Sequence, residues 1–473
     1  MKRIDRRAVL KSVTATTLLS SPWTRAAVNW TGKARVLQGP MLGPATATTA
    51  SVWLRGTAGS ALGVRATSPA GEVVTSTEVT VVEDSDFCAV ARLDGLEPDT
   101  AYTYEVLVDG QPDPYLLDFA PYSLRTAPAE SARFKVAFGS CAKFQDDPIQ
   151  PIWTAVEASR PDLFFWLGDN IYADTLHDHV MSEDYRRQRS VVSLQNVIRN
   201  VPSLAIWDDH DFGLNDHDAR NPGKDMSLEI FKRYWANPSY GLGEAPGVFF
   251  QYSFGGVDFF FLDVRYYRSP NEEPDSNSKT MLGRAQMDWL EDALRRSQAP
   301  FKVLISGSGW TKAKGPIGDA WSAYLTERDR LFRFITRNEI PGVLLISGDT
   351  HVGEANCIPW SEQGGYDFYD FVSSPLAQKP EGGSWLERRP EVRLRQVYYR
   401  TNNFGELSFD MTLDDPAVTF RLRDTRNQSV WRPITLTASQ LTPGQSSWRE
   451  QIDRVSLQRQ ESMSSGGPYY IPL

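Results

Sequence analysis

Cysteine, histidine and long apolar runs are all scarce in this sequence. The 473 residues include only three cysteines, Cys88, Cys141 and Cys357. This excludes a disulfide-stapled scaffold, and at least one thiol is free or a ligand unless it bridges two chains. No stretch after the N-terminal segment reaches the roughly 18 apolar residues of a membrane-spanning helix, so we expect a soluble mature protein without a transmembrane segment. Net positive charge is also lacking. The net charge of −9 argues against a surface that binds nucleic acid through bulk charge.

The N-terminal segment, residues 1–27, has the order of a secretory signal. Basic residues come first, a mildly apolar stretch follows, and small residues stand at Ala26 and Ala27. Arg6 and Arg7 precede an apolar residue and a lysine, which resembles a twin-arginine export signal, the alternative being an ordinary signal with a chance arginine pair. We therefore expect export by the twin-arginine translocation machinery and a periplasmic or extracellular location.

Residues 33–127 are predicted to form an all-β sandwich of the immunoglobulin or fibronectin type. Short alternating runs at residues 51–55, 72–74 and 89–93 are separated by turns and show no helical period. The stretch from Gly95 to Val106 leads from a turn into a strand with an early tyrosine, Tyr102, typical of the tyrosine corner of such sandwiches. A linker with Pro128 and small polar residues ends this domain, which resembles a fibronectin type III module.

From Arg133 the pattern changes to buried strands alternating with amphipathic helices, which predicts a layered α/β domain over residues 132–446. The tail, residues 447–473, has no assignment. The predicted strands of the domain are Phe134–Phe138, Leu163–Leu167, Ser203–Trp207, Val257–Leu262, Lys302–Ile305, Val343–Ile346, Leu407–Met411 and Val418–Leu422, and the predicted helices are Ile152–Ala158, Asp184–Asn200, Leu228–Trp235, Gly283–Arg296 and Glu327–Asn338.

Four of the apolar runs end in acid, sulfur or histidine. In α/β sheets ligands collect beyond the carboxyl ends of strands, and a glycine before the donor lets the backbone turn sharply there. One such element alone would be weak evidence, because Gly-Asp is a common turn. Four such elements in this order along the chain indicate a metal site. The four are Gly139-Ser140-Cys141, Gly168-Asp169-Asn170-Ile171-Tyr172, Trp207-Asp208-Asp209-His210-Asp211 and Ser347-Gly348-Asp349-Thr350-His351.

This series resembles the calcineurin-like metallophosphoesterases, and more closely the alkaline phosphatase D (PhoD-like) family. The first superfamily motif is replaced by Gly-Ser-Cys141, and the second ends in Tyr172 rather than aspartate. The third and fourth carry Asp209 and Asp349 in place of asparagine and histidine. These departures, with a β-sandwich in front, are the PhoD-like pattern. The resemblance covers residues 36–422 and implies a four-layer αββα sandwich of two β-sheets flanked by helices.

The resemblance and the donor types together imply a mixed-metal centre. Thiolate and phenolate stabilise a highly charged transition metal, which favours Fe(III), whereas an oxygen-rich second site favours calcium. The family implies a second calcium, whose ligands the sequence does not name. Asp211 is expected to orient His210, which acts on the phosphoryl group. The expected metal ligands are Cys141, Asp169, Tyr172, Asp209, Asp349 and His351, the catalytic residues His210 and Asp211, and the substrate contacts Asn170 and Arg265.

The expected function is hydrolysis of phosphate mono- and diesters by metal-activated water, releasing phosphate. A phospholipase D-like phosphodiesterase is an alternative within that chemistry. A secreted binding protein with structural metals and a cysteine hydrolase using Cys141 are alternatives outside it. For single residues the structural alternatives are an inert buried thiol at Cys141, packing at Tyr172 and an ion pair at Arg265. The protein is expected to be a monomer.

Overall fold

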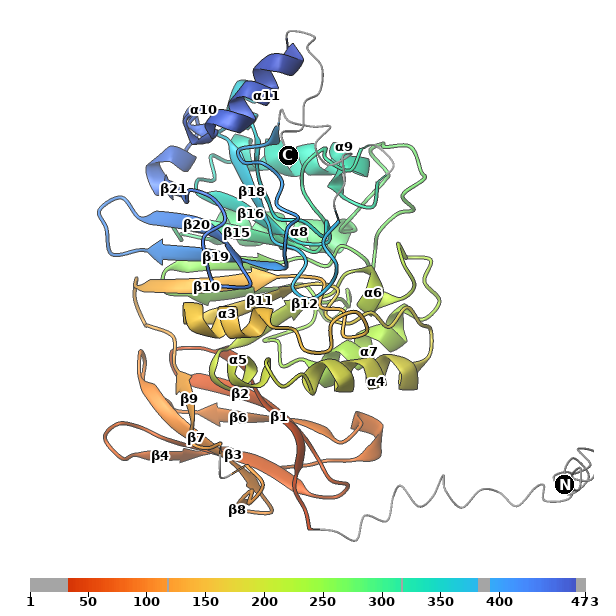
Figure 1. The fold of residues 1–473 in the computed structure, drawn as a ribbon, viewed down its shortest axis with the longest axis vertical. Helices are drawn as coiled ribbons and strands as arrows, with labels where there is room; N and C mark the ends of the chain where they lie inside the picture. The colour runs from red at the N-terminus through yellow and green to blue at the C-terminus, as the bar shows by residue number, and fades with distance from the viewer. Residues whose placement is uncertain (1–32, 117–118, 316–317, 382–391, 465–473) are drawn as a thin grey trace, which may run out of the picture.

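The computed structural model describes residues 33–116, 119–315, 318–381 and 392–464 (Figure 1). The expected signal segment, residues 1–27, lies outside this part of the chain. A β-sandwich is followed by a larger α/β region, with two short helices near the C-terminus. This confirms the predicted fold class. The C-terminal helices are α10 (Trp448–Gln451) and α11 (Arg454–Ser464).

The N-terminal sandwich consists of two antiparallel sheets, one in the order β1-β2-β6 and one in the order β4-β3-β7-β8, with β5 and β9 added to β3 and β7. The expected tyrosine corner is present, since the hydroxyl of Tyr102 accepts a hydrogen bond from the backbone N–H of Glu97 at 2.8 Å. The strands are β1 (Val36–Ala45), β2 (Thr49–Gly56), β3 (Ala61–Thr67), β4 (Val73–Thr75), β5 (Val79–Thr80), β6 (Cys88–Asp94), β7 (Ala101–Val108), β8 (Gln111–Pro112) and β9 (Tyr122–Arg125).

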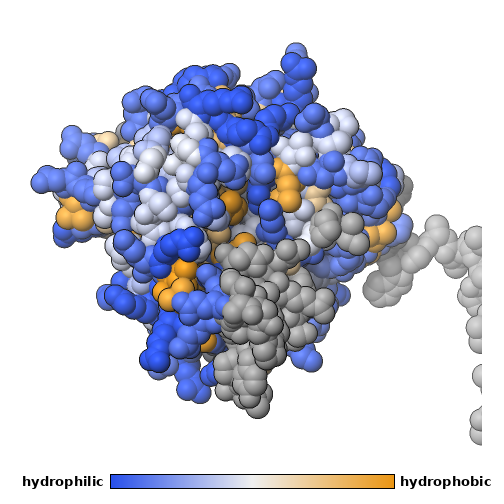
Figure 2. Space-filling view, turned by 90° about the horizontal axis from the view of Figure 1, so that it is seen from above, coloured by the Kyte–Doolittle hydropathy of each residue, from blue (hydrophilic) through white to orange (hydrophobic). Residues whose placement is uncertain are grey.

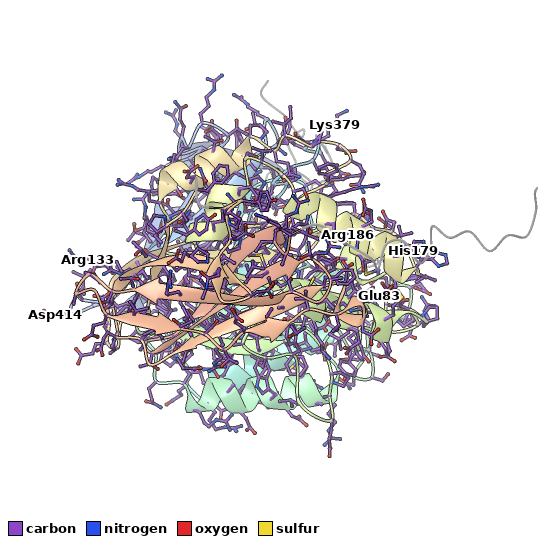
Figure 3. All side chains as sticks on the ribbon, turned by 90° about the horizontal axis from the view of Figure 1, so that it is seen from below. Glu83, Arg133, His179, Arg186, Lys379 and Asp414 are labelled. Atoms are coloured by element: carbon purple, nitrogen blue, oxygen red, sulfur yellow. The ribbon has the colours of Figure 1, made fainter. Side chains whose placement is uncertain are left out.

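The sandwich is docked on the α/β region by buried side chains. Trp53 of β2 is fully buried, and its indole N–H donates to the carbonyl of Arg233 at 2.7 Å. Asp86 accepts hydrogen bonds from Tyr234 and from Arg186 (2.7 Å). Figure 3 shows Arg186 on the side of the molecule where Glu83 of the sandwich also lies. The sandwich has a hydrophobic core of its own, and Met41, Trp53 and Cys88 extend from it into the core of the α/β region.

The α/β region is built on two six-stranded sheets packed face to face, in the orders β12-β11-β10-β19-β20-β21 and β13-β14-β15-β16-β18-β17. Phe165 of β11 contacts Phe259 and Phe261 of β14 edge to face at 5.0 and 4.9 Å, which joins the sheets. The strands are β10 (Arg133–Gly139), β11 (Leu163–Leu167), β12 (Ser203–Ile206), β13 (Phe250–Phe254), β14 (Val257–Phe261), β15 (Phe301–Ser306), β16 (Val343–Ser347), β17 (Glu354–Ile358), β18 (Phe368–Val372), β19 (Asn403–Asp410), β20 (Ala417–Asp424) and β21 (Ile434–Thr437).

Helices cover both outer faces of the paired sheets (Figure 1). The prediction of one continuous helix over residues 184–200 is wrong, because the structure has two helices there. The first helix ends at Arg189, and the side chain of Ser193 donates to the carbonyls of Ile149 and Gln150 at 2.6 and 2.9 Å. The intervening Val191 and Val192 are β-branched and favour helix weakly. The helices are α3 (Ile152–Ser159), α4 (Asp178–Arg189), α5 (Gln195–Asn200), α6 (Asp209–Phe212), α7 (Lys224–Tyr234), α8 (Arg284–Arg296) and α9 (Leu325–Arg337).

The surface carries no continuous apolar band in the view from above (Figure 2), where hydrophobic residues form small separate groups among hydrophilic ones. Over the residues that the structure describes, no helix combines the length and the apolar character that crossing a membrane requires.

Candidate functional site

The carboxyl ends of four strands from both sheets meet at the candidate site. Cys141 follows β10, Asp169 follows β11, Asp209 follows β12, and Asp349 follows β16. The two sheets are tied there by the backbone N–H of Asp349, which donates to the hydroxyl of Ser140 at 3.0 Å. Gly348 is needed for this approach, since a Cβ at that position would lie 2.5 Å from the Ser140 side chain.

The turns that carry the donors are backbone-strained. Four donor residues have left-handed backbone conformations: Cys141 (φ 63°), Asp169 (φ 49°), Asp349 (φ 69°) and His351 (φ 53°). This conformation is unfavourable for residues other than glycine and concentrates at functional sites. The sharp turns aim the side chains of separate strands at a common point.

The first donor group is formed by Cys141, Asp169, Tyr172 and His351. The thiol of Cys141 lies 3.4 Å and the hydroxyl of Tyr172 3.3 Å from Oδ2 of Asp169. The Tyr172 hydroxyl lies 3.2 Å from Nε2 of His351. Ligand atoms of Cys141, Asp169 and His351 all fall within 4.8 Å of one another. The structure thus brings together the four residues that the sequence predicted for one ion.

Burial makes the anionic forms of these donors costly. It raises the pKa of the Cys141 thiol to about 11 and holds the pKa values of Tyr172 and Asp169 well above their usual ranges. The neighbouring acidic groups add to the shifts, because each disfavours a second negative charge. A multivalent cation would supply the missing counter-charge, and thiolate, phenolate, carboxylate and imidazole suit a transition metal. The residues present therefore fit the expected ion.

A second donor group shares Asp169 with the first. Ligand atoms of Asp169, Asp209 and His210 lie within 4.8 Å of one another. Burial opposes ionisation of Asp209, but Arg265 and then His210 favour it, and the pKa of this carboxyl is lowered. Asp349 is close enough to Asp209 for the two carboxylates to repel each other, and Lys314 pairs with its Oδ2. Asp209 is thus placed beside Asp169 as predicted, while the partner that the structure gives Asp349 is a lysine.

The ring of His210 is held by Asp174, and the expected contact with Asp211 is wrong. Nδ1 of His210 lies 2.7 Å from Oδ1 of Asp174, and the ring packs on Tyr172 at a centroid distance of 4.1 Å. Burial opposes the charged ring, but Asp169 and the hydrogen bond to Asp174 raise the pKa of His210 to about 10. The acceptor at Nδ1 leaves Nε2 as the ring atom available to a ligand.

Asp211 instead supports the turn from which His210 projects. Its Oδ1 accepts from the backbone N–H of Asp208 at 2.7 Å, as part of the capping box of α6. Its Oδ2 accepts from the backbone N–H of Asn170 at 3.1 Å and from the Asn170 side chain. A side chain at the third helical position points back to the cap, which is why it cannot face the neighbouring ring.

Asn170 is wholly buried, and its side-chain nitrogen also donates to the carbonyl of Ile206 at 2.9 Å. Arg265 is likewise fully buried, and its guanidinium pairs with Asp208 and Asp319. Arg265 therefore forms the structural ion pair that the sequence analysis gave as the alternative to a substrate contact. The substrate role of Asn170 stays a prediction.

Several residues at the site were missed by the sequence analysis. Asp174, Lys314 and Asp319 lie in loops without strand or helix periodicity. The signal for Asp174 was its position two residues after Tyr172. Ligand atoms of Asp209, Asp216 and Asp319 form a third group within 4.8 Å.

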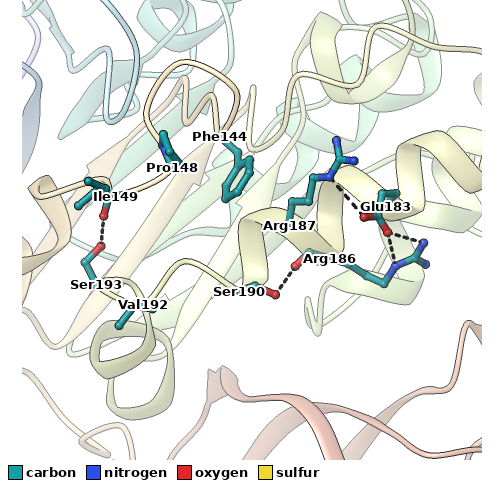
Figure 4. A pocket seen from close by; sticks show the side chains of 9 residues that line it. All are labelled: Phe144, Pro148, Ile149, Glu183, Arg186, Arg187, Ser190, Val192 and Ser193. Carbon is teal, nitrogen blue, oxygen red and sulfur yellow. Dashed lines mark hydrogen bonds and ion pairs between the residues drawn. The ribbon is translucent and has the colours of Figure 1, made fainter. Parts of the chain in front are cut away.

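A separate groove of about 620 Å³ lies between the loop after β10 and helix α4 (Figure 4). Its apolar wall includes Ile149 and Val192, whose exposed fractions are 73% and 85%. Phe144 also lines it, and the residues on either side of Phe144 contact Tyr172. Lys143 lies over the Tyr172 ring and Gln145 donates to its carbonyl at 3.1 Å. The chain therefore runs from the donor cluster to the groove through Phe144, although no donor residue lines the groove. It is lined by Phe144, Pro148, Ile149, Glu183, Arg186, Arg187, Ser190, Val192 and Ser193.

Two packed sheets with acid, sulfur and histidine donors at their carboxyl ends define a metallophosphatase-like domain. Residues 136–420 match the model of the PhoD-like phosphatase family, and the chain belongs to that family. Residues 33–114 match a domain of unknown function, DUF7800, so the sandwich carries that family name rather than a fibronectin one.

Individual relatives agree with this assignment. Alkaline phosphatase D of Bacillus subtilis (strain 168) is 25% identical over 316 residues, 56% of this chain and 53% of that protein, so the match spans about half of the relative's length. A solved structure of PhoD superposes with a TM-score of 0.66 at 16% identity, covering 90% of this chain and 97% of that one. The purple acid phosphatase PPD1 from yellow lupin (Lupinus luteus) seeds gives 0.60 at 12% identity, covering 88% and 76%.

Proposed function

We propose that this chain is an exported, metal-dependent phosphoesterase that hydrolyses phosphate mono- and diesters and releases phosphate. The observation that carries the proposal is the buried group of Cys141, Asp169, Tyr172 and His351 beside the hydrogen-bonded pair of His210 and Asp174. Family membership and the relative named alkaline phosphatase D support it.

The donor set favours Fe(III) at Cys141 and Tyr172 and a calcium ion on the side of Asp209, with Asp169 between them. Bound ions of this kind would polarise phosphoryl oxygens and lower the pKa of a coordinated water. The protein's part is to hold its acidic side chains in place against their mutual repulsion. Hydrogen bonds at the backbone of Asp349 and in the capping box of α6 do this.

His210 is the proton donor in this proposal. Asp174 accepts from Nδ1, which fixes the ring and leaves the proton on Nε2 for the leaving alkoxide. The P–O bond of the ester breaks as the water oxygen bonds to phosphorus, and the departing oxygen takes the Nε2 proton.

The groove of Figure 4, where the lining residue Phe144 is flanked by two residues that contact Tyr172, favours one narrower alternative, a phosphodiesterase for esters with an apolar group. Ile149 and Val192 expose apolar surface there, and Arg187, whose side chain is 48% exposed, stands at its edge. An apolar substituent would bury these side chains and gain hydrophobic stabilisation. Substitution of Val192 by aspartate should then reduce kcat/KM for alkyl diesters and leave p-nitrophenyl phosphate turnover unchanged.

Export by the twin-arginine route, a periplasmic or extracellular location and a monomeric state are part of the proposal. The sequence of residues 1–27 supports the export and the location.

Elemental analysis of the purified protein, alongside assays on chromogenic mono- and diesters, tests the proposal. We expect iron and calcium to copurify, chelation to abolish hydrolysis and re-addition to restore it. Thiol alkylation under mild conditions should have no effect, because Cys141 is fully buried. Hydrolysis that survives complete chelation but is lost on alkylation would instead support the cysteine hydrolase.

A further inference from the structure

Three protein cations gather on the side of the centre formed by Asp349 and Asp319. Lys314, in the loop after β15, pairs with Oδ2 of Asp349, and its ammonium lies 3.5 Å from the backbone carbonyl of Asp319. Arg265 and Arg268 both pair with the Asp319 carboxylate. Both arginine side chains are fully buried, so these charges are fixed in place.

The carboxylate of Asp319 is saturated by these partners. Oδ1 accepts from Asn271 at 2.7 Å, and nitrogen atoms of Arg268 and Arg265 lie 2.7 and 3.1 Å from it. Oδ2 accepts from Arg265 at 2.5 Å. Spacing alone would allow Asp319 to join Asp209 and Asp216 around a metal, but an ion there would have to displace a buried guanidinium.

Asp169 has a different environment. Its contacts are with Cys141, Tyr172 and the backbone N–H of His210. Within the described residues, neither a lysine nor an arginine forms an ion pair with it. The negative charge around Asp169 would therefore be balanced by bound ions. The negative charge of Asp319 is balanced by side chains of the protein itself.

Backbone contacts of the described residues on either side of Lys314 set its position. The N–H of Gly315 donates to the carbonyl of Lys312 at 3.1 Å, and the N–H of Gly318 donates to that of Gly315 at 3.3 Å. A Cβ at position 318 would lie 2.6 Å from the Lys314 carbonyl oxygen. These contacts thus hold the ammonium against Asp349, although a flexible side chain can withdraw where a buried guanidinium cannot.

We propose that Arg265, Arg268 and Lys314 are built-in counter-ions that replace a second divalent ion on the Asp319 side. The chain would then hold one divalent ion beside the ion at Cys141, and that divalent ion would compete with Lys314 for Asp349. The inference rests on the proposed metal centre. It differs from the two calcium ions that the family resemblance implies.

The first test is the metal content of the iron-loaded full-length mature protein. Equilibrium dialysis against a calcium series with elemental analysis, and a terbium luminescence titration, should each give one tight divalent site per iron. Two tight sites per chain in a protein that hydrolyses phosphate esters would overturn this inference and leave the proposed function intact. A protein that binds neither iron nor calcium would refute the centre itself.

The second test is Lys314→Gln, with Lys312→Gln as the matched control that removes the same charge from the exposed part of the loop. Losing the competing charge-assisted bond should tighten calcium binding roughly 10- to 100-fold in Lys314→Gln, which corresponds to about 1.4–2.8 kcal/mol. The control should bind calcium like the wild type. Unchanged or weaker calcium binding by folded Lys314→Gln would overturn the competition.

Discussion

Replacing His210 by alanine should slow hydrolysis while leaving the metal content near that of the wild type. A positioned proton donor contributes about 10²- to 10⁴-fold in rate. The upper part of this range is expected here, because the ring is fixed on two sides. Asp174 holds Nδ1 at 2.7 Å, and Tyr172 packs on the ring face at 4.1 Å.

Two variants at Asp174 distinguish its role in orienting the His210 ring from the effect of its negative charge. Asp174→Asn keeps an acceptor for Nδ1 but makes the hydrogen bond neutral, a loss of about 1.4 kcal/mol or roughly tenfold in rate. Asp174→Ala should approach the His210→Ala defect, and the double variant should be no worse than His210→Ala alone. Because Asp174 contributes to the raised pKa of His210, both variants should move the alkaline limb of the kcat profile to lower pH.

The assay is steady-state kinetics on aryl phosphates whose leaving groups span several pKa units, with iron and calcium measured on the same samples. The defect of His210→Ala should grow with leaving-group pKa. His210 also lies within ligand distance of Asp169 and Asp209. If metal content falls in proportion to activity, His210 is a ligand and the assignment is refuted.

Three further outcomes are expected. Cys141→Ser should lose iron and its visible charge-transfer band, and Tyr172→Phe should shift that band; a colourless wild type that is fully active with zinc alone would contradict both. Replacing Arg6 and Arg7 by lysine should leave precursor in the cytoplasm, and undiminished periplasmic activity would refute the twin-arginine route. Asp86→Ala should cost about 2 kcal/mol, because it removes the acceptor of the buried Tyr234 hydroxyl on α7 and one of the two acidic partners of Arg186 on α4, seen as a lower thermal midpoint; an unchanged midpoint would show that this contact is dispensable.

The buried strands could be predicted because their signal is local. The strand Leu163–Leu167 has the predicted bounds, since both faces are covered and the run is apolar throughout. The helix break after Arg189 could not be predicted, because it depends on Ser193 bonding to carbonyls more than forty residues earlier in the chain. The weak helical propensity of Val191 and Val192 permits the break, and the tertiary contact of Ser193 fixes where it lies.

Donors that follow strands directly were also predictable, because the strand fixes where Cys141 and Asp169 must lie. The partners of these donors were not. Lys314 reaches Asp349 from a loop thirty-five residues earlier, and Asp174 was overlooked in favour of Asp211, the immediate neighbour of His210. Adjacency in sequence does not imply contact in space, because the capping geometry of α6 turns the Asp211 side chain back toward Asp208.

Metal binding should affect the lifetime of the protein as well as its activity. The reason is the left-handed backbone conformation at four donor residues, Cys141, Asp169, Asp349 and His351. Each such conformation costs roughly 1 kcal/mol or more. Together they lower the free energy of unfolding of the metal-free chain by a sizeable share of the stability of a typical domain. The turns that the metal centre requires therefore destabilise the metal-free protein. Proteolysis should degrade molecules without bound ions faster than molecules that have acquired them.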